Sequence, residues 1–393
     1  MFDSTNLLEP ASLTEAAALM QEHRSAGTHL AFIGGGTHTI GQPASGDVLF
    51  STRKLNRIIE YAPEDQTVTV EAGVTVAQLT EVLASCGQRL VLDVADPHRS
   101  TIGGAIASNA FGPRRLRFGS LKDLILGISL VRADGIEARA GGKVVKNVAG
   151  FDISKFVVGS HGTLALITSA TLRVHPLPDV SEAIRVTQLS AGQVWDLVMA
   201  MREQQLEPTT IIAVGTTDGP GDYDVDVVFE GVRSGADAQA NCLRNIAERR
   251  GWSMEELPSD RVLAADAEAL SAGPLRVHCT TSPCEFAQSN ERAIRPLMHT
   301  LTSPVVSTYP ALGIFTVAGT PTPATTAELA NCRKQIELRG GSLIVEAQPA
   351  PHDGAPMIEP WGTPPPSFQL MREIKARFDP NGRLASGRFV GGL

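Results

Sequence analysis

The chain has 393 residues, of which 42% are hydrophobic and 19% charged, an ordinary globular composition that is long enough for two domains. Its formal net charge is −8, which argues against nucleic acid as the main partner. The five cysteines are scattered and form no CxxC pair. The sequence therefore indicates neither a disulfide framework nor an iron–sulfur or zinc site. This use of cysteine is most typical of a protein in a reducing compartment.

No stretch of the sequence resembles a targeting or membrane segment. The opening residues, MFDSTNLLEP, lack a basic region followed by an apolar core, so we expect no signal peptide. The longest uncharged run, Phe156–Leu172, is interrupted by glycines, hydroxyls and His161, which predicts a loop and a strand rather than a membrane span. We expect a cytoplasmic protein that reaches the inner face of a membrane only through partner chains.

The first part of the chain alternates short strands with a few helices. Ser12 and Glu15 form a capping-box pattern that predicts a helix ending near Gly27. The apolar patterns predict further helices at 76–85 and 102–109, and strands at 29–33, 48–52, 57–62, 67–71, 126–133 and 164–174. The breaker His175-Pro176-Leu177-Pro178 marks the expected domain boundary.

Beyond that boundary a strand–helix–strand–strand–helix series occurs twice. The predicted strands are 183–188, 209–214, 224–230, 275–280, 305–308, 313–317 and 342–347, and the helices are 191–205, 236–250, 285–301 and 325–339. This order predicts an antiparallel sheet with helices on one face. We expect the Pro-rich stretch 349–366 to be a linker and residues 368–377 to form a last helix. The expected fold class is α+β.

A run of three glycines, Gly34–Gly36, directly follows the predicted strand 29–33. It could be no more than a tight turn. A Rossmann fingerprint is not met, because Thr39 stands where the third glycine belongs. A loop that holds a pyrophosphate through its amides and the hydroxyls of Thr37 and Thr39 fits better.

A second segment, Asp96–Arg115, also combines glycines with small side chains. Close packing of a helix against a sheet would explain Gly103-Gly104 alone. It would not explain the polar and turn-forming residues that follow, Asn109, Gly112, Pro113, Arg114 and Arg115. A third small-residue run occupies Val158–Thr168. Because glycines let backbone amides approach an anion closely, the three segments together predict one extended nucleotide site built from several loops.

These segments resemble the FAD-binding domain of the vanillyl-alcohol-oxidase/PCMH class. The segment GSHGTL at 159–164 belongs to the same resemblance. Within the class, the chain is most similar to the FAD-binding subunits of bacterial glycolate oxidases, through GPRR at 112–115 and KNVAGFD at 146–152. The tail Met371–Phe389 resembles the closing helix of that family. The match is strong over residues 1–178 and 367–393, and elsewhere rests on the order of elements.

The resemblance implies a two-lobed FAD-binding domain over residues 1–178, a cap domain over 179–366, and a C-terminal helix and tail, 367–393, that return to the first domain. It also implies the residues around FAD. These are Gly34, Gly35, Gly36, Thr37, His38 and Thr39 at the pyrophosphate, Pro97, Thr101, Gly103, Gly104 and Ser108 along the flavin and ribityl chain, and Gly162, Thr163 and Ile167 at the adenine and dimethylbenzene side.

The function implied is that of an FAD-dependent oxidoreductase, as the FAD-binding subunit of a multi-subunit glycolate, or 2-hydroxy acid, oxidase. The implied partners are a larger FAD-containing catalytic subunit and an iron–sulfur subunit. The first alternative is a self-sufficient FAD oxidase or dehydrogenase of a small alcohol or hydroxy acid. The second is a scaffold subunit with a vestigial flavin site. The sequence identifies no catalytic residue and no metal site.

The sequence does not decide whether several histidines take part in flavin binding or catalysis. Some relatives bond a histidine of the glycine loop to the flavin, but we expect FAD to be non-covalent and His38 to be a polar loop residue. His98 and His161 are expected to be loop residues rather than catalysts.

His352-Asp353-Gly354 faintly resembles a metal motif of catalytic relatives, which Ala355 breaks. We interpret it as linker. Arg114, Arg115 or Arg276 could bind a carboxylate group. For Arg114 and Arg115, an ordinary solvent-exposed position explains the sequence equally well.

Overall fold

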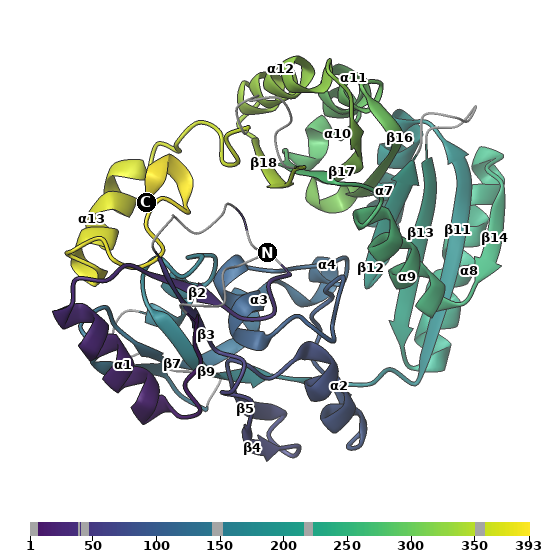
Figure 1. Cartoon of the computed structure of the whole chain (residues 1–393). Coiled ribbons are helices and arrows are strands. Elements are labelled where there is room, and N and C mark those ends of the chain that lie inside the picture. Colours follow the sequence, from purple (N-terminus) through teal and green to yellow (C-terminus); the bar gives the residue numbers. More distant parts are fainter. Residues whose placement is uncertain (1–6, 38–39, 41–46, 144–151, 216–222, 350–357) are drawn as a thin grey trace. The chain divides into compact units, whose positions relative to one another are not determined.

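The computed structural model in Figure 1 describes residues 7–37, 40, 47–143, 152–215, 223–349 and 358–393. The chain divides into two compact units. Unit 1 comprises residues 1–112, 119–177 and 363–393, and unit 2 comprises 113–118 and 178–362. Helices combine with mainly antiparallel sheets, which confirms the α+β class.

One lobe of unit 1 is a three-stranded parallel sheet with a helix. The sheet order is β1 (Leu7–Leu8), β3 (Val48–Ser51) and β2 (Leu30–Ile33). Helix α1 (Leu13–Ser25) begins where the sequence predicts, because the Ser12 hydroxyl accepts the Glu15 amide at 3.1 Å. A small apolar core contains Met20, Leu30, Phe50 and Leu384. The core therefore joins α1 and the sheet to the C-terminal tail.

The other lobe of unit 1 is a five-stranded antiparallel sheet. Its strands, in order, are β4 (Ile58–Ala62), β5 (Thr67–Glu71), β9 (Leu166–Arg173), β7 (Ile125–Val131) and β8 (Glu137–Gly141). Its core is filled largely by α2 (Val76–Ala84) and α3 (Ile102–Ser108), together with residues of two short helices. A short pair, β6 (Gln88–Arg89) with β10 (His175–Pro176), and two short helices, α5 (Leu121–Leu124) and α6 (Ile153–Val157), complete the lobe.

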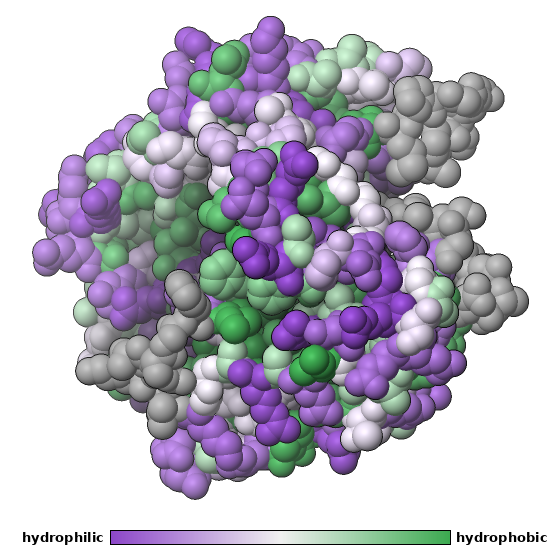
Figure 2. All heavy atoms as spheres, turned by 90° about the vertical axis from the view of Figure 1, so that its left-hand side faces the viewer, coloured by the Kyte–Doolittle hydropathy of each residue, from purple (hydrophilic) through white to green (hydrophobic). Residues whose placement is uncertain are grey.

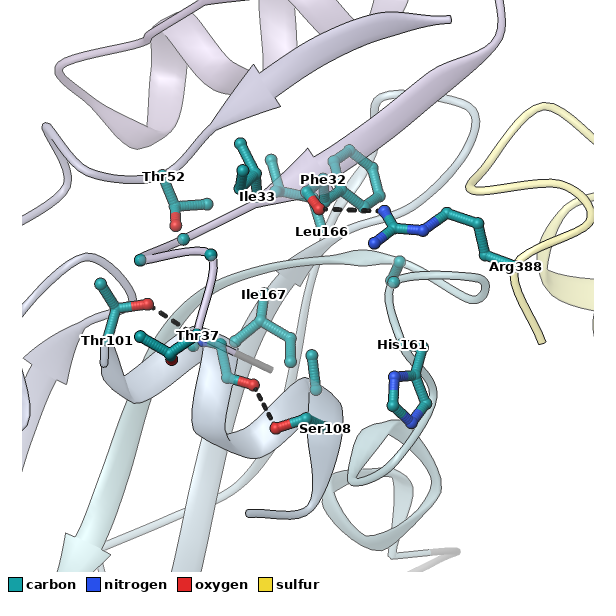
Figure 3. A pocket seen from close by; sticks show the side chains of 18 residues that line it. Phe32, Ile33, Thr37, Thr52, Thr101, Ser108, His161, Leu166, Ile167 and Arg388 are labelled. Carbon is teal, nitrogen blue, oxygen red and sulfur yellow. Dashed lines mark hydrogen bonds between the residues drawn. The ribbon is translucent and has the colours of Figure 1, made fainter. Parts of the chain in front are cut away.

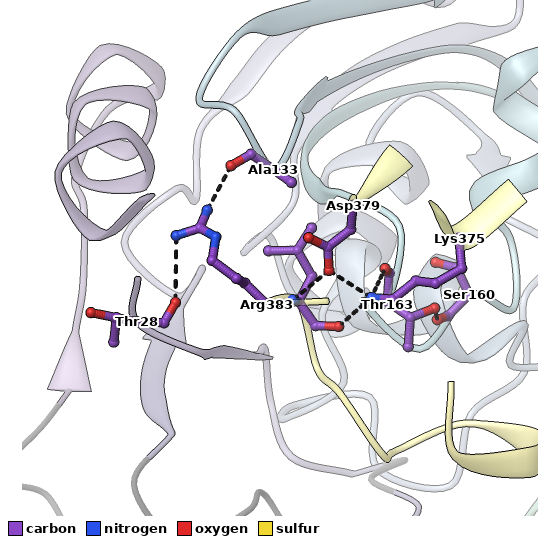
Figure 4. Close-up of polar contacts among 8 residues, drawn as sticks. Thr28, Ala133, Ser160, Thr163, Lys375, Asp379 and Arg383 are labelled. Carbon is purple, nitrogen blue, oxygen red and sulfur yellow. Dashed lines mark hydrogen bonds and ion pairs between the residues drawn. The ribbon is translucent and has the colours of Figure 1, made fainter. Parts of the chain in front are cut away.

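The last residues of the chain pack into unit 1. After α13 (Phe368–Phe378), Leu384 forms a parallel bridge with Leu30, and Arg383 donates to the carbonyl oxygen of Ala133 at 2.7 Å (Figure 4). A final 3-10 turn spans Val390–Gly392. The tail thus adds backbone pairing to β2, the strand that leads into the glycine loop.

Unit 2 is built on one eight-stranded antiparallel sheet. Its strands, in order, are β14 (Met254–Leu257), β11 (Val180–Leu189), β13 (Tyr223–Gly231), β12 (Thr210–Gly215), β16 (Leu301–Tyr309), β17 (Ile314–Pro321), β15 (Leu275–Thr280) and β18 (Ser342–Ala347). The sheet has two halves, one built from β11 to β14 and the other from β15 to β18. Counted along the chain, the strands of each half lie in the order fourth, first, third, second from the outer edge inward. The halves join where their second strands, β12 and β16, pair. The repeated series in the sequence is therefore a repeated structural unit.

The helices that fill the main core of unit 2 are α7 (Ala191–Glu203), α8 (Arg233–Arg250), α10 (Phe286–Ser289), α11 (Arg295–Met298) and α12 (Thr325–Glu337). The expected single helix over 285–301 is wrong. A 3-10 turn (Pro283–Glu285) precedes α10, a π-helical turn (Asn290–Ile294) separates α10 from α11, and β16 already begins at Leu301. Pro296, which has no amide proton, lies just after the π turn.

The expectation that all helices lie on one face of this sheet is also wrong. Helix α9 (Ser259–Leu270) contributes Asp266, which accepts the hydroxyl of Tyr309 at 2.8 Å and that of Ser307. Because these residues alternate along β16 with the core residue Val306, α9 lies on the opposite face. A one-turn helix, α4 (Arg115–Phe118), also belongs to unit 2.

Part of the expected linker 349–366 is fixed to unit 2 instead. The amide of Val345 donates to the carbonyl oxygen of Pro360 at 2.8 Å, and the Gln348 amide group pairs with the backbone of Ile358 at 2.8 and 3.0 Å. The fragment His352–Gly354 lies outside the described residues. The linker interpretation therefore does not hold for residues 358–360.

Exposed large hydrophobic side chains occur in both units, and the face in Figure 2 carries hydrophilic and hydrophobic side chains together. Those exposed are Leu7, Ile59, Ile136, Phe156, Leu177, Val232, Leu338 and Leu370. Within the described residues, every helix is too short or too polar to cross a membrane.

Candidate cofactor site

A pocket within unit 1 gathers the three small-residue segments (Figure 3). Its lining residues are Phe32, Ile33, Gly34, Gly35, Gly36, Thr37, Thr52, Thr101, Gly103, Gly104, Ala107, Ser108, His161, Gly162, Ala165, Leu166, Ile167 and Arg388. They come from the end of β2 and its loop, from the end of β3, from α3 and its N-cap, from the turn before β9 and the start of β9, and from the C-terminal tail. Segments that are far apart in sequence therefore share one cavity.

The glycine loop after β2 is held from its carbonyl side. Arg53 donates to the carbonyl oxygens of Gly34 at 3.1 Å and Gly35 at 3.4 Å, and Arg99 donates to that of Gly35 at 3.3 Å. Since C=O and N–H point in opposite directions within a peptide unit, the amides of Gly35 and Gly36 face away from these guanidinium groups. Successive amides with one orientation can bind an anion such as a phosphate.

Only glycine fits the narrowest point of this loop. A Cβ atom at Gly35 would lie 1.7 Å from the carbonyl oxygen of Arg99, and one at Gly34 would lie 2.2 Å from the Thr101 hydroxyl oxygen. Gly36 has a φ of +70°, in the left-handed region. The Thr37 hydroxyl lies 3.0 Å from that of Ser100. The first and second segments are therefore in direct contact.

The two glycines of α3 have different surroundings. A Cβ at Gly103 would lie 2.6 Å from the Cβ of Ala72, so this glycine permits close packing against the loop after β5. A Cβ at Gly104 would approach only the Thr101 hydroxyl, at 3.0 Å. That hydroxyl caps α3 by accepting the Gly104 amide at 3.2 Å. Gly104 thus keeps one wall of the pocket flat.

The third segment is tied to α3 by backbone hydrogen bonds. The amides of Gly159 and His161 donate to the carbonyl oxygens of Ile106 at 3.0 Å and Ala107 at 2.8 Å. His161 and Gly162 both have positive φ, +49° and +79°. The His161 ring lies 5.5 Å from that of Phe389 in the tail. His161, which the sequence suggested was only a loop residue, is therefore both a loop residue and part of the pocket wall.

Most of the residues expected around FAD line this pocket. They are Gly34, Gly35, Gly36, Thr37, Thr101, Gly103, Gly104, Ser108, Gly162 and Ile167. Pro97 and Thr163 do not line it: the Pro97 carbonyl oxygen accepts the Ala77 amide at 2.9 Å, and Thr163 is buried with its hydroxyl on the carbonyl oxygen of Ser160 at 2.7 Å. His38 and Thr39 lie outside the described residues.

The sequence did not indicate Arg388 as a pocket residue. Its side chain extends from the tail toward the pocket, and Nη1 lies 3.4 Å from the carbonyl oxygen of Phe32 (Figure 3). Burial lowers the pKa of Arg388, and the negative charge of Asp47 opposes this shift. Among the lining residues that the structure describes, Arg388 is the one with a formal charge at neutral pH, counting histidine as neutral.

The other candidates lie elsewhere. Arg276 pairs with Glu346 at 2.9 Å and donates to the carbonyl oxygen of Leu270 at 3.2 Å, so its charge is already matched within unit 2. Arg114 and Arg115 belong to unit 2, and His98 is exposed in unit 1. In the described ranges, no three His, Cys, Asp or Glu side chains are grouped to hold a metal ion.

Comparison with known proteins supports the resemblance in the sequence. The glycolate oxidase subunit GlcD of Bacillus subtilis is 35% identical over 153 residues, which is 38% of this chain and 33% of that protein. The glycolate oxidase subunit GlcE of Escherichia coli is 34% identical over 175 residues, 44% of this chain and 48% of that protein. The matched part thus spans less than half the length of either relative.

A D-lactate dehydrogenase of Archaeoglobus fulgidus is 32% identical over 176 residues, 43% of this chain and 38% of that protein. In fold, the chain is similar to an alkyldihydroxyacetonephosphate synthase structure, with a TM-score of 0.74 at 18% identity, covering 96% of this chain and 75% of the other. Residues 5–141 match the family described as FAD binding domain. Over residues 5–141 the chain is therefore similar to FAD-binding domains.

Proposed function

We propose that the pocket of unit 1 holds FAD and that the chain is the FAD-binding subunit of a multi-subunit glycolate, or related 2-hydroxy acid, oxidase. The observation that carries this proposal is the convergence of three small-residue segments on one pocket of unit 1, the unit that contains the FAD-binding domain match at residues 5–141. Bound FAD would supply hydride acceptance and one-electron release, a combination that a nicotinamide does not offer. The relatives GlcD of Bacillus subtilis and GlcE of Escherichia coli are each named as a glycolate oxidase subunit.

The geometry of the pocket suits such a cofactor. The amides of Gly35 and Gly36 would bind the diphosphate, because Arg53 and Arg99 hold the opposite side of the loop. The flat wall at Gly104 would let the flavin or ribityl chain lie against the backbone of α3. Thr101 and Ser108 would position this helix, since their hydroxyls bond its backbone at 3.2 and 2.9 Å.

The proposed partners are a larger FAD-containing catalytic subunit and an iron–sulfur subunit, with membrane contact only through them and a cytoplasmic location. The test is co-purification from the native host, followed by identification of cofactors and partner chains. We expect FAD, both partners, and glycolate or D-lactate turnover only in the complex. Turnover needs a base near the substrate hydroxyl and a cation for its carboxylate. Because the sequence identifies no catalytic residue, we expect the isolated chain to be a poor dehydrogenase.

The alternative is a self-sufficient FAD-dependent oxidase or dehydrogenase of a small alcohol or hydroxy acid. Its support is the similarity to proteins named D-lactate dehydrogenase and D-2-hydroxyglutarate dehydrogenase, names that mention no subunit. Rapid anaerobic bleaching of the flavin of the isolated chain by glycolate or D-lactate would favour this alternative. Purified protein that never shows flavin absorbance would instead indicate a scaffold subunit with a vestigial site.

A further inference from the structure

We propose that Arg388, near the end of the chain, supplies the positive charge that faces the diphosphate of FAD, so that the C-terminal tail is part of the cofactor site. This proposal rests on FAD binding in the unit 1 pocket but not on any particular substrate or partner. It assigns a binding role to a residue that lies more than 200 positions beyond the FAD-binding domain match at residues 5–141.

The first argument is charge. The described lining of the pocket consists of glycines, hydroxyl residues, apolar side chains, His161 and Arg388, with no acidic residue among them. FAD carries its formal negative charges on the diphosphate. A guanidinium group binds phosphate oxygens with geometric specificity and stays protonated in proteins, even where burial lowers its pKa. Arg388 is therefore the complement of the only strongly charged part of the ligand.

The second argument is burial. Arg388 is only 8% exposed, and taking an ion out of water costs free energy that a counter-charge must offset. Asp47 is the acidic group that acts on it among the described residues, and burial still outweighs that interaction in lowering the pKa of Arg388. Burial disfavours the charged form of Arg388, and a bound diphosphate would supply further negative charge to stabilise it.

The third argument is position. Arg388 Nη1 lies 3.4 Å from the carbonyl oxygen of Phe32, two residues before the glycine loop begins. The tail reaches this place by pairing with β2: the amide of Leu30 donates to the carbonyl oxygen of Arg383 at 2.8 Å, and the amide of Ala385 donates to that of Leu30 at 2.7 Å. The backbone that carries Arg388 is thus fixed to the strand that carries the loop.

Arg383 offers a matched control. It lies in the same tail, is 3% exposed, and also donates to backbone carbonyl oxygens, those of Ala133 at 2.7 Å and Thr28 at 3.4 Å. It does not line the pocket. If buried tail arginines only fasten the tail, replacing either one should affect FAD in the same way.

The test is the dissociation constant of the flavin-free full chain for FAD, ADP and riboflavin, measured by titration calorimetry at low and moderate salt. We expect Arg388→Gln, which removes the positive charge, to weaken FAD and ADP by about 10- to 100-fold, the range for a hydrogen bond to a charged group. Riboflavin, which has no phosphate, should bind as before. Arg388→Lys should retain most of the affinity, and the salt dependence of FAD binding should be smaller in Arg388→Gln than in the wild type.

Arg383→Gln should lower the melting temperature but leave the FAD dissociation constant within about threefold, a change below 1 kcal/mol. The proposal is overturned if Arg388→Gln keeps wild-type FAD affinity, or if it weakens riboflavin as much as FAD. Should Arg388→Gln fail to fold, Arg388→Met and Arg388→Lys provide the charge comparison. Wild-type protein that binds FAD but turns over no glycolate with its partners would reject the proposed function alone.

Discussion

The ammonium group of Lys375 donates to the carbonyl oxygen of Thr163 at 2.8 Å, although 212 positions separate the two residues (Figure 4). The same nitrogen donates to Asp379 Oδ2 at 2.7 Å and to the carbonyl oxygen of Leu384 at 2.8 Å. These three acceptors match the three protons of an ammonium group. Lys375 therefore links α13, the tail and the turn that carries His161 and Gly162.

Replacing Lys375 by methionine should destabilise unit 1 and weaken its hold on flavin. The carboxylate of Asp379, which is 2% exposed, would lose its cation, and breaking one side of a buried pair costs about 3–5 kcal/mol. Thermal unfolding and the flavin content of purified protein measure the two effects. Lys334→Met, at an exposed position on α12, is the control. A Lys375→Met protein with wild-type melting temperature and flavin content would show that this contact is dispensable.

Stability should fall with acid partly through His278. This residue is 7% exposed on β15; burial lowers its pKa, Arg115 and Arg276 lower it further, and Glu346 opposes them. The unfolded chain therefore takes up a proton near pH 6.5 while the folded chain does not. Stability is present above that pH and is lost as the pH falls toward the lower folded value.

Urea unfolding at pH 7.5 and 5.5 checks this sign. His175 in unit 1 has its pKa lowered in the same direction, by burial and then by Arg173 and Arg89, so the informative quantity is the difference between proteins. His278→Asn, whose amide takes the place of Nδ1 beside the Thr316 hydroxyl, should lose less stability between the two pH values than the wild type does. An equal loss in both proteins would exclude His278 as a source of the acid sensitivity.

FAD should be released intact when the protein is denatured, with one FAD per chain. The alternative in the sequence is a covalent bond to His38, which lies outside the described residues. Acid precipitation separates the two cases, because free flavin stays in the supernatant while covalent flavin stays in the pellet. A yellow pellet that becomes colourless in His38→Ala would overturn the non-covalent prediction.

Local signals predicted the elements that surround the pocket. Helices α1, α2 and α3 begin after Ser12, Thr75 and Thr101, and each of these hydroxyls accepts an amide of the first turn, as the sequence pattern predicts for α1. Caps and turns are decided within a few residues, so they can be identified from sequence. The α+β class and the resemblance to FAD-binding proteins rest on such local features.

Features that depend on distant partners were missed. Helix α9, which was not predicted, carries the buried Asp266 on the side that faces β16. Arg388 reaches Phe32 across 356 positions, and nothing in the tail sequence indicates that contact. Pro97 was placed at the flavin by resemblance alone, whereas in the structure it contacts the first turn of α2. Pairings over such distances follow from tertiary packing rather than from local pattern.

The adjacent glycines of α3 give a direct test of the pocket. Gly104→Val should disturb the fold little, because Gly104 lines the pocket and the added Cβ meets only the Thr101 hydroxyl, at 3.0 Å, which must shift slightly. It should abolish FAD binding or weaken it severely, since the side chain occupies space that the cofactor needs. Flavin absorbance and a titration with FAD measure the loss.

Gly103→Ala provides the contrast. Its new methyl group would lie 2.6 Å from the Cβ of Ala72 and 3.0 Å from its carbonyl oxygen, so α3 must shift away from the loop after β5. Overpacking of this kind costs about 1–3 kcal/mol, and we expect a lower melting temperature. Gly104→Val should therefore lose flavin at nearly wild-type stability, whereas Gly103→Ala should lose stability first. If Gly104→Val binds as much FAD as the wild type, the cofactor does not lie against this wall.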